Sequence, residues 1–296
     1  MDGKNSKESF VVIGPGRVGT AMAKVLVRAG YDCLGLFGRD PDRVKAAGEI
    51  AGARAFARLE PGITREADIV LVAVPDDVIA EAAADLVRKD AVGPGAVLIH
   101  FSGLVTSEAL AGGRGEEAGR ASAHPNLAFA DPAAAAGKIS GVYFGVEGND
   151  RGVGAAERIV QDIGGIAVRI PSDGKVAYHL AAVFASNGMV VLASISSSIL
   201  SHIGVKSDVA EIITARLMLG TAQNLGEFGV LKALTGPVVR GDHRTVAAHM
   251  DVLGGLPSDL SGIYRRLFRR MVDLSISAKR GTKEKYESII NLLEKK

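Results

Sequence analysis

The sequence has few of the residues that form covalent or metal cross-links. Cys33 is the only cysteine among 296 residues, so no disulfide can form within the chain and no thiolate metal cluster is possible. The six histidines show no close ligand pairing such as H-x-x-x-H, so we expect no metal site. The formal net charge is only +2, which gives no reason to expect nucleic acid or a membrane surface as a partner.

The composition is that of a globular protein. Apolar residues make up 47% of the chain and charged residues 23%, and the length allows two domains. The polar segment 1–8 is no signal peptide, so we expect a cytoplasmic protein. Segment 181–200 is apolar enough to resemble a membrane span, but Ser186, Asn187, Gly188 and four further serines interrupt it. We therefore predict a buried helix of a helical domain there.

Segment 10–22 carries a glycine pattern between a predicted buried strand, 10–13, and a predicted helix. Its glycines follow the G-x-G-x-x-G spacing, in which the first permits a tight turn and the second lets a pyrophosphate approach bare backbone. The third lets the helix lie close to the strand, and the helix N-terminus offers free N–H groups to phosphates. A tight turn without a ligand is the alternative. The strand and amphipathic helix on either side favour a dinucleotide site, with the candidates Gly14, Pro15, Gly16, Arg17, Val18 and Gly19.

The residues after the next predicted strand, 33–37, bear on which nicotinamide cofactor binds. NAD-binding folds place an acidic residue about twenty positions past the glycines, where it holds the ribose hydroxyls. Here Gly38 and Arg39 stand in that place, and a guanidinium can fork onto a 2′-phosphate. Arg43 can add a second charge one helical turn later, whereas Asp40 could instead serve a ribose hydroxyl. The pattern favours NADP, with NAD as the alternative.

Strands and helices alternate through the first half of the chain and give way to helices in the second. Apolar runs without alternation indicate strands covered on both faces, and therefore a mostly parallel, doubly wound sheet. We predict an α/β domain of the Rossmann type over residues 1–170 and an all-helical domain over residues 171–296. The predicted strands are 10–13, 33–37, 53–57, 68–74, 96–101, 120–124, 142–146 and 166–170. The predicted helices are 41–51, 75–88, 154–163, 176–203, 207–225, 242–253, 258–278 and 283–293.

Three groups of residues end core strands, where they would face a cleft between the two domains. Ala73, Val74 and Pro75 can pass under the cofactor ribose, or form no more than a strand end and helix cap. Ser102 could reach nicotinamide or substrate, or act as a turn serine. His124, with a pKa near neutrality, could donate a proton to a carbonyl oxygen, or be a histidine satisfied within a loop.

The first predicted helix of the second domain carries polar residues on one face. His179, Ser186 and Asn187 are spaced at i, i+7 and i+8. Polar groups on an otherwise apolar helix either pair internally or line a pocket, so we take His179 and Asn187 as catalytic candidates and Ser186 as a substrate-binding candidate.

A polar turn between later helices supplies two further substrate-binding candidates, Thr235 and Arg240. The Arg240 guanidinium could hold a substrate carboxylate through two hydrogen bonds. The alternative is a salt bridge to Asp242 or Asp208 that fixes the turn.

These segments together resemble a bacterial family that joins a Rossmann-like domain to a helical domain long catalogued as of unknown function. The resemblance covers nearly the whole chain. It rests on Gly14-Pro-Gly-Arg-Val-Gly19, His100-Phe-Ser-Gly103, His124-Pro125, Tyr178-His-Leu-Ala-Ala-Val-Phe-Ala-Ser-Asn187, Ala233-Leu-Thr-Gly-Pro237 and Arg240-Gly-Asp242. The helical part is similar to the C-terminal domains of 6-phosphogluconate and β-hydroxyacid dehydrogenases and of pyrroline-carboxylate reductases.

The resemblance implies a homodimer joined through the helical domain. It also implies reduction of a small 2-oxo acid, since some similar proteins act as alternative ketopantoate reductases. His124-Pro125 with Ser102 resembles prephenate dehydrogenases, whose histidine in such a position takes part in hydride chemistry. The β-hydroxyacid dehydrogenases place a lysine one turn before an asparagine on this helix, whereas this chain has His179 and Asn187 there and its nearest lysine is Lys175.

Three hypotheses follow. The first is an NADP-dependent reductase of a small oxo acid, with His124 or His179 as proton donor, Asn187 and Ser102 orienting the oxygen, and Arg240 on the carboxylate. The second is an imine reductase like pyrroline-carboxylate reductase, which needs little help from a general acid. The third is a sensor that binds NADP without turnover, although a sensor has no need of proton donors beside the nicotinamide.

Overall fold

The structure is a computed structural model that describes residues 7–115 and 117–294. The signal-peptide prediction rests on residues 1–8, of which 1–6 lie outside the described part. The chain forms two compact units, an N-terminal unit over Met1–Ser186 and a C-terminal unit over Asn187–Lys296.

The N-terminal unit is built on an eight-stranded sheet with the order β3-β2-β1-β4-β5-β6-β7-β8. Every neighbouring pair in the described sheet is parallel except β6 with β7, which is antiparallel. The predicted mostly parallel, doubly wound sheet is therefore confirmed. The strands are β1 (Ser9–Ile13), β2 (Asp32–Phe37), β3 (Ala55–Phe56), β4 (Ile69–Val72), β5 (Val97–His100), β6 (Arg120–Pro125), β7 (Tyr143–Gly148) and β8 (Ile166–Arg169).

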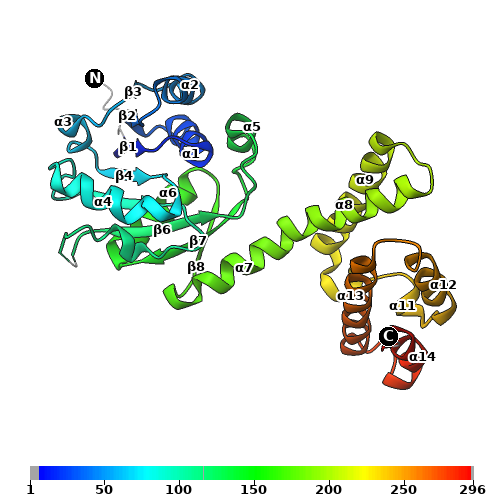
Figure 1. Cartoon of the computed structure of the whole chain (residues 1–296). Helices are drawn as coiled ribbons and strands as arrows, with labels where there is room; N and C mark the ends of the chain where they lie inside the picture. The colour runs from blue at the N-terminus through cyan, green and yellow to red at the C-terminus, as the bar shows by residue number, and fades with distance from the viewer. Residues whose placement is uncertain (1–6, 116, 295–296) are drawn as a thin grey trace. The chain divides into compact units, whose positions relative to one another are not determined.

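Helices cover both faces of this sheet (Figure 1). The core on one face lies beneath α1 (Arg17–Arg28), α2 (Pro41–Ala51), α5 (Pro132–Ala136) and α6 (Asp150–Asp162). The core on the other face lies beneath α3 (Pro61–Thr64), α4 (Ile79–Arg88) and the 3₁₀ turn η2 (Ser107–Leu110). Every residue of β4 and β5 is buried, which explains why their sequences, apart from His100 at the end of β5, are continuous apolar runs rather than alternating ones.

The first helix after the sheet, α7 (Lys175–Ala185), follows the short 3₁₀ turn η3 (Ser172–Gly174) and belongs to the N-terminal unit. The secondary-structure pattern changes near residue 171. The division between the units lies one helix further along the chain, after Ser186. The reason is physical, because Lys175 and Tyr178 attach α7 to β6, β7 and the loop after β6.

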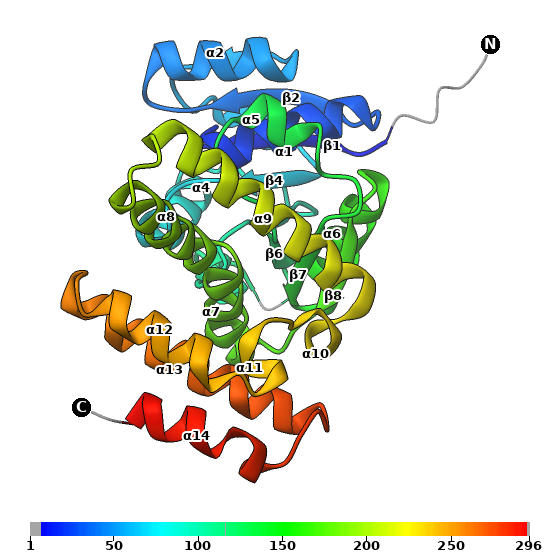
Figure 2. The same cartoon turned by 90° about the vertical axis from the view of Figure 1, so that its right-hand side faces the viewer.

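The C-terminal unit is entirely helical in its described part. Its helices are α8 (Asn187–His202), α9 (Ser207–Phe228), α10 (Val230–Ala233), α11 (Pro237–Arg240), α12 (His243–Leu253), α13 (Ser258–Ser277) and α14 (Lys283–Glu294). The last four enclose a small apolar core that includes Val238, Val246, Val272, Tyr286 and Ile289. Figure 2 shows α8 and α9 side by side as a hairpin.

The single helix predicted over 176–203 is wrong, because α7 ends at Ala185 and α8 starts at Asn187. The prediction that segment 181–200 is buried is also wrong, since no residue of α8 is buried within this chain. Segment Ser172–His202 is long and apolar enough to cross a membrane by length and composition. Its first half, however, carries the buried Lys175, whose charged head is held at the sheet.

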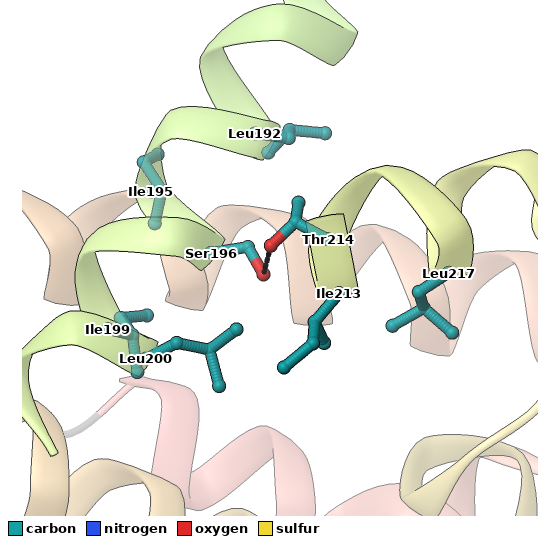
Figure 3. A pocket seen from close by; sticks show the side chains of 8 residues that line it. All are labelled: Leu192, Ile195, Ser196, Ile199, Leu200, Ile213, Thr214 and Leu217. Atoms are coloured by element: carbon teal, nitrogen blue, oxygen red, sulfur yellow. Dashed lines mark hydrogen bonds between the residues drawn. The ribbon is translucent and has the colours of Figure 1, made fainter. Parts of the chain in front are cut away.

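An open apolar groove lies between α8 and α9 (Figure 3). Its volume is about 340 Å³, and its walls include Leu192, Ile199, Ile213 and Leu217. One polar contact crosses it, where the Thr214 hydroxyl donates to Ser196 Oγ at 3.2 Å. The remaining lining is apolar, so water is a poor occupant of this groove.

Candidate functional site

The turn between β1 and α1 forms the cradle that the glycine spacing predicts. Gly14 has a positive φ of 78°, and a side chain there would meet Val74 Cγ1 at 2.5 Å. A side chain at Gly19 would meet Ala73 Cβ at 2.8 Å, so this glycine lets α1 approach the end of β4. At Gly16, by contrast, a Cβ would meet nothing within 4 Å, and no side chain caps the helix there. The N-terminal N–H groups of α1 therefore face open space, which suits a phosphate group.

The residues after β2 differ in whether their side chains are already engaged within the chain. Asp40 is the N-cap of α2, and its Oδ1 accepts hydrogen bonds from the backbone N–H groups of Asp42 at 3.1 Å and Arg43 at 3.2 Å. Its Oδ2 lies 3.2 Å from Arg43 Nε. Both carboxylate oxygens are therefore engaged. Arg39 is exposed and forms no ion pair or hydrogen bond among the described residues.

Gly38, at the end of β2, has the same close-approach character as the glycines of the first turn. A side chain there would meet Val44 Cγ2 at 2.5 Å and Pro15 Cδ at 3.3 Å. The ends of β1 and β2 are thus drawn together, so Pro15, Gly38 and the start of α2 form one edge of the candidate cofactor site.

The end of β5 is held by a histidine and a serine. The His100 side chain is fully buried, and its Nδ1 accepts a hydrogen bond from Ser102 N at 3.1 Å. Burial lowers the pKa of His100 to about 4, so its ring is neutral at physiological pH. Ser102 Oγ accepts from the backbone N–H groups of Leu104 at 3.0 Å and Val105 at 2.9 Å. This is the turn role that was the alternative for Ser102, and it leaves the hydroxyl hydrogen free to donate.

His124, at the end of β6, is half-buried and oriented by one hydrogen bond. Its Nδ1 lies 3.0 Å from the Phe101 carbonyl oxygen, so Nδ1 carries a proton and donates it, and Nε2 is free to exchange one. Burial lowers the pKa of His124, with smaller contributions from His179 and Lys175, while the Phe101 hydrogen bond opposes the shift. The neutral ring is therefore the dominant form near pH 7.

His179 of α7 lies directly against His124. The two ring centroids are 5.7 Å apart, with an angle of 82° between the ring planes. Both rings crowd the backbone at Gly103, where a Cβ would lie 2.5 Å from His179 Nδ1 and 3.0 Å from His124 Nε2. His179 Nδ1 is buried and has no hydrogen-bond partner among the described residues. The structure thus brings together two candidates from distant segments, one at a strand end and one on a helix.

The helix predicted to carry His179, Ser186 and Asn187 is interrupted between α7 and α8. Ser186 is the C-cap of α7, and Asn187 is the first residue of α8. Within the C-terminal unit, Thr235 precedes α11 and Arg240 is its exposed last residue. Arg240 forms no ion pair within the described ranges 7–115 and 117–294, so the salt bridge considered for it is not formed.

Asp242 explains why that salt bridge is not formed. Its carboxylate caps α12, accepting from Thr245 N at 3.1 Å and from the Thr245 hydroxyl at 2.7 Å. These hydrogen bonds lower the pKa of Asp242, and the nearby Arg240 charge adds to the shift. The Arg240 guanidinium is left for solvent or a ligand.

Sequence reasoning gave no site role to three charged residues around the histidine pair. Lys175 and Glu147 form a buried ion pair beneath α7, and the Asp76 charge acts on His100, His124 and Lys175. A signal for Glu147 was present, because it is the one charged residue in β7, a strand whose middle four residues are buried.

Comparisons with known proteins agree with this architecture. Residues 2–118 match the Rossmann-like domain, and residues 142–271 match a domain of unknown function, DUF2520. The crystal structure of protein TM1727 from Thermotoga maritima is 30% identical, with a TM-score of 0.72, and the match covers 91% of this chain and 99% of that one. The chain belongs to the family that joins these two domains. A search of curated proteins finds no match.

Two solved structures with lower identity share the fold. BF3122 from Bacteroides fragilis, provisionally described as an NADP oxidoreductase, is 20% identical with a TM-score of 0.70, and the match covers 90% of this chain and 99% of that one. A pyrroline-5-carboxylate reductase from Coxiella burnetii is 19% identical with a TM-score of 0.62, and the match covers 93% and 98% respectively. Both extend the similarity over nearly the whole chain.

Proposed function

We propose that this protein is an NADPH-dependent oxidoreductase that reduces a small 2-oxo acid such as ketopantoate. One observation carries the proposal: the glycine cradle after β1 and the His124–His179 pair lie at the same, carboxyl edge of the sheet. Ligands of open α/β sheets bind at that edge. The similarity to oxidoreductases of the same fold supports the assignment.

The residues present fit the cofactor. Gly14, Gly16 and Gly19 leave room for a pyrophosphate at the start of α1, with Ala73 and Val74 beside them. Arg39 is free to bind a 2′-phosphate, whereas Asp40 is occupied as a helix cap. When bound, NADPH would supply the hydride that reduces the substrate.

The histidines would handle the proton. A carbonyl oxygen that gains negative charge during reduction needs a donor, and His124 Nε2 is the free nitrogen of a ring fixed by the Phe101 carbonyl. His179 lies against that ring and can stabilise or relay the proton. Arg240 remains a candidate for binding the substrate carboxylate. Asn187, Ser186 and Thr235 remain candidates for binding other polar groups of the substrate.

The lowered pKa of His124 favours a second candidate, reduction of an imine. A protonated imine brings its own proton to the reaction, so a neutral histidine at the site is no obstacle. The fold is that of pyrroline-5-carboxylate reductases, which makes a cyclic imine acid the compound to test.

The deciding experiment is NADPH oxidation with a panel of acceptors, ketopantoate first, other 2-oxo acids next and pyrroline-5-carboxylate last. Removing a general acid typically costs about 10²–10⁴-fold in rate, so His124→Ala should lose most of its turnover of an oxo acid. If both His124→Ala and His179→Ala still reduce the imine, the second candidate function is favoured. Tight binding of NADPH without its oxidation in the presence of any acceptor would favour a nucleotide sensor over both reductase functions.

We also propose that the protein works as a cytoplasmic homodimer. The α8–α9 hairpin leaves large apolar side chains in water, among them Val190 at 67%, Ile212 at 61% and Leu217 at 70% exposure. A patch of this kind on a single chain is typical of a protein interface. A second copy of the same hairpin has matching apolar chemistry and can cover it.

A further inference from the structure

Lys175, the first residue of α7, is a lysine with no exposed surface. Lysine normally keeps its ammonium group in water, and a fully buried lysine is rare unless it is paired. Its Nζ lies 3.5 Å from Glu147 Oε1 of β7 and donates a hydrogen bond to Ser122 Oγ of β6. Burial lowers the pKa of Lys175, and the Glu147 carboxylate opposes that shift by favouring the ammonium form.

Glu147 is held as completely as its partner. One carboxylate oxygen accepts from Ser107 N at 2.8 Å, and the other accepts from the hydroxyls of Ser107 at 2.8 Å and Ser172 at 3.1 Å. The Ser122 hydroxyl, in turn, donates to the Ser102 carbonyl at 3.1 Å. The network ties α7, β6, β7 and the turn after β5 together, and its charges are satisfied only while α7 stays in place.

A second attachment lies one helical turn further along α7. The Tyr178 ring covers the bare backbone of Gly145, where a Cβ would lie 2.6 Å from the ring, and its hydroxyl accepts from Asn126 Nδ2 at 2.7 Å. Lys175 and Tyr178 are three apart on a helix and so share a face, just as Gly145 and Glu147 are two apart on a strand and share a face. The helix is therefore matched to β7 at two points.

The next residue after Tyr178 is His179, whose ring lies against His124. Its place depends on the depth and rotation of α7, because no hydrogen bond among the described residues holds its Nδ1. The attachments at Lys175 and Tyr178 set both quantities.

We propose that the Lys175–Glu147 pair is a positioning device that holds His179 against His124. The inference rests on the proposed function, in which these two histidines handle the proton. Lys175 Nζ is bound to Glu147 and Ser122 and acts on His179 through α7, so it is a positioning residue and not a catalytic one. Glu147 and Ser122 are the parts of the device that lie on the sheet.

The device also has an electrostatic consequence for His124. The charged groups that act on His124 are His179 and Lys175 from α7 and Asp76 from the turn after β4. Lys175 and His179 lower the pKa of His124, and Asp76 raises it. Removing the Lys175 charge should therefore raise the pKa of His124. Loss of burial around His124 would raise it too, so the contact between the two histidine rings is measured together with the titration.

The test compares Lys175→Met with the double variant Lys175→Met/Glu147→Gln. The single variant leaves a buried carboxylate without its partner, which is strongly destabilising, and it can fail to fold. The double variant removes both charges at nearly constant volume and should regain most of the thermal stability. Lys89→Met is the matched control, since Lys89 pairs with Asp85 at 2.7 Å on the exposed end of α4.

We expect the double variant to bind NADPH with wild-type affinity but to turn over at least about tenfold more slowly, because small misplacements of reacting groups are costly. Proton NMR titration should show a raised pKa for His124 and a weakened contact between the His124 and His179 rings. Lys89→Met should change none of these quantities.

A double variant with wild-type turnover and an unchanged His124 titration would overturn the inference and make the pair a stability element only. The titration needs no substrate. If none of the tested acceptors supports NADPH oxidation by the wild-type protein, the proposed function fails. The contact between the histidine rings and the His124 titration still decide the inference in that case.

Discussion

At the scale of single residues, cofactor choice depends on which side chains near the end of β2 are already engaged. Asp40 lies in the region where an acid would select NAD, yet both of its carboxylate oxygens are committed to α2. Arg39, one residue earlier, is exposed and can fork onto a phosphate. The hydrogen bonds of Asp40 therefore add to the sequence pattern in favouring NADP, and they are a feature that the sequence motif does not reveal.

Arg39→Ala should raise the Kd for NADPH by about 10–100-fold, because a hydrogen bond to a charged group contributes about 1.5–3 kcal/mol. The Kd for NADH should stay the same, since NADH has no 2′-phosphate. Fluorescence titration of both cofactors measures the two values. Equal losses for NADPH and NADH would show that Arg39 does not bind the 2′-phosphate.

Asp40→Ala should behave in the opposite way. Loss of the N-cap should lower the free energy of unfolding by about 1 kcal/mol, measured by urea denaturation, with the preference for NADPH retained. Asp40→Asn keeps a capping side chain and should be close to wild type. A marked loss of NADH affinity in Asp40→Asn would instead place the residue on a ribose hydroxyl.

The pH dependence of the reaction should report His124. Only the protonated ring can donate to a carbonyl oxygen, and burial lowers its pKa below the usual value. The kcat/KM for oxo-acid reduction should therefore be highest at low pH and fall as the pH rises through that lowered pKa. In the oxidative direction the neutral ring is the active form, so the dependence reverses. His124→Gln should abolish the titration in both directions, and a wild-type profile in that variant would exclude His124 as the proton donor.

At the scale of secondary-structure elements, the loop after β5 limits how the two histidines meet. Gly103 has no Cβ. A Cβ at this position would lie 2.5 Å from His179 Nδ1 and 3.0 Å from His124 Nε2. The missing methyl group lets α7 and the end of β6 converge on the same backbone.

Gly103→Ala should therefore separate the rings while leaving both present. We expect kcat to fall by at least about tenfold with the NADPH Kd unchanged, since the glycine cradle lies after β1 and β4 rather than β5. Steady-state kinetics and cofactor titration provide the two values. Gly62→Ala, at a position where a Cβ meets nothing within 4 Å, is the control. Unchanged kcat in Gly103→Ala would mean that the close approach has no role in the reaction.

Much of the element order was predictable because local chemistry sets it. The helix predicted over 41–51 matches α2 residue for residue, since an Asp cap, a Pro at the first turn and a following Gly mark its ends. The break between α7 and α8 was not predictable, because the apolar periodicity continues through Ser186. The antiparallel pairing of β6 with β7 also leaves no trace in either strand's own pattern.

The site was predictable only where position on a strand was enough. His124 could be named as a candidate because polar residues at the carboxyl ends of parallel strands gather at one edge. Lys175 could not, because a lysine in a sequence normally indicates a solvated surface, and its partner Glu147 is distant along the chain. Burial of the pair is a property of the tertiary contacts and not of either segment.

At the scale of the whole molecule, the apolar surface of the C-terminal unit requires an explanation that its own fold does not supply. The α11–α14 core is covered, whereas α8 has no buried residue and the groove between α8 and α9 is open. A membrane would also cover apolar side chains, but α8 carries a run of serines, and α7 before it is attached to the sheet by a charged pair. Both observations are consistent with the proposed second copy of the hairpin as the occupant.

Leu217→Arg should convert the proposed dimer into a monomer. Leu217 is 70% exposed and lines the α8–α9 groove, so an arginine there would place a charge in an apolar interface at a cost of several kcal/mol. Sedimentation equilibrium should give twice the chain mass for the wild type and the single chain mass for the variant. Val252→Arg, at a 56% exposed position of α12 outside the groove, should remain dimeric. A wild-type protein that is monomeric would show that a second copy does not cover the hairpin. A variant that stays dimeric would show that the dimer forms through another surface. Wild-type protein that sediments with vesicles would identify a membrane as the partner of the hairpin.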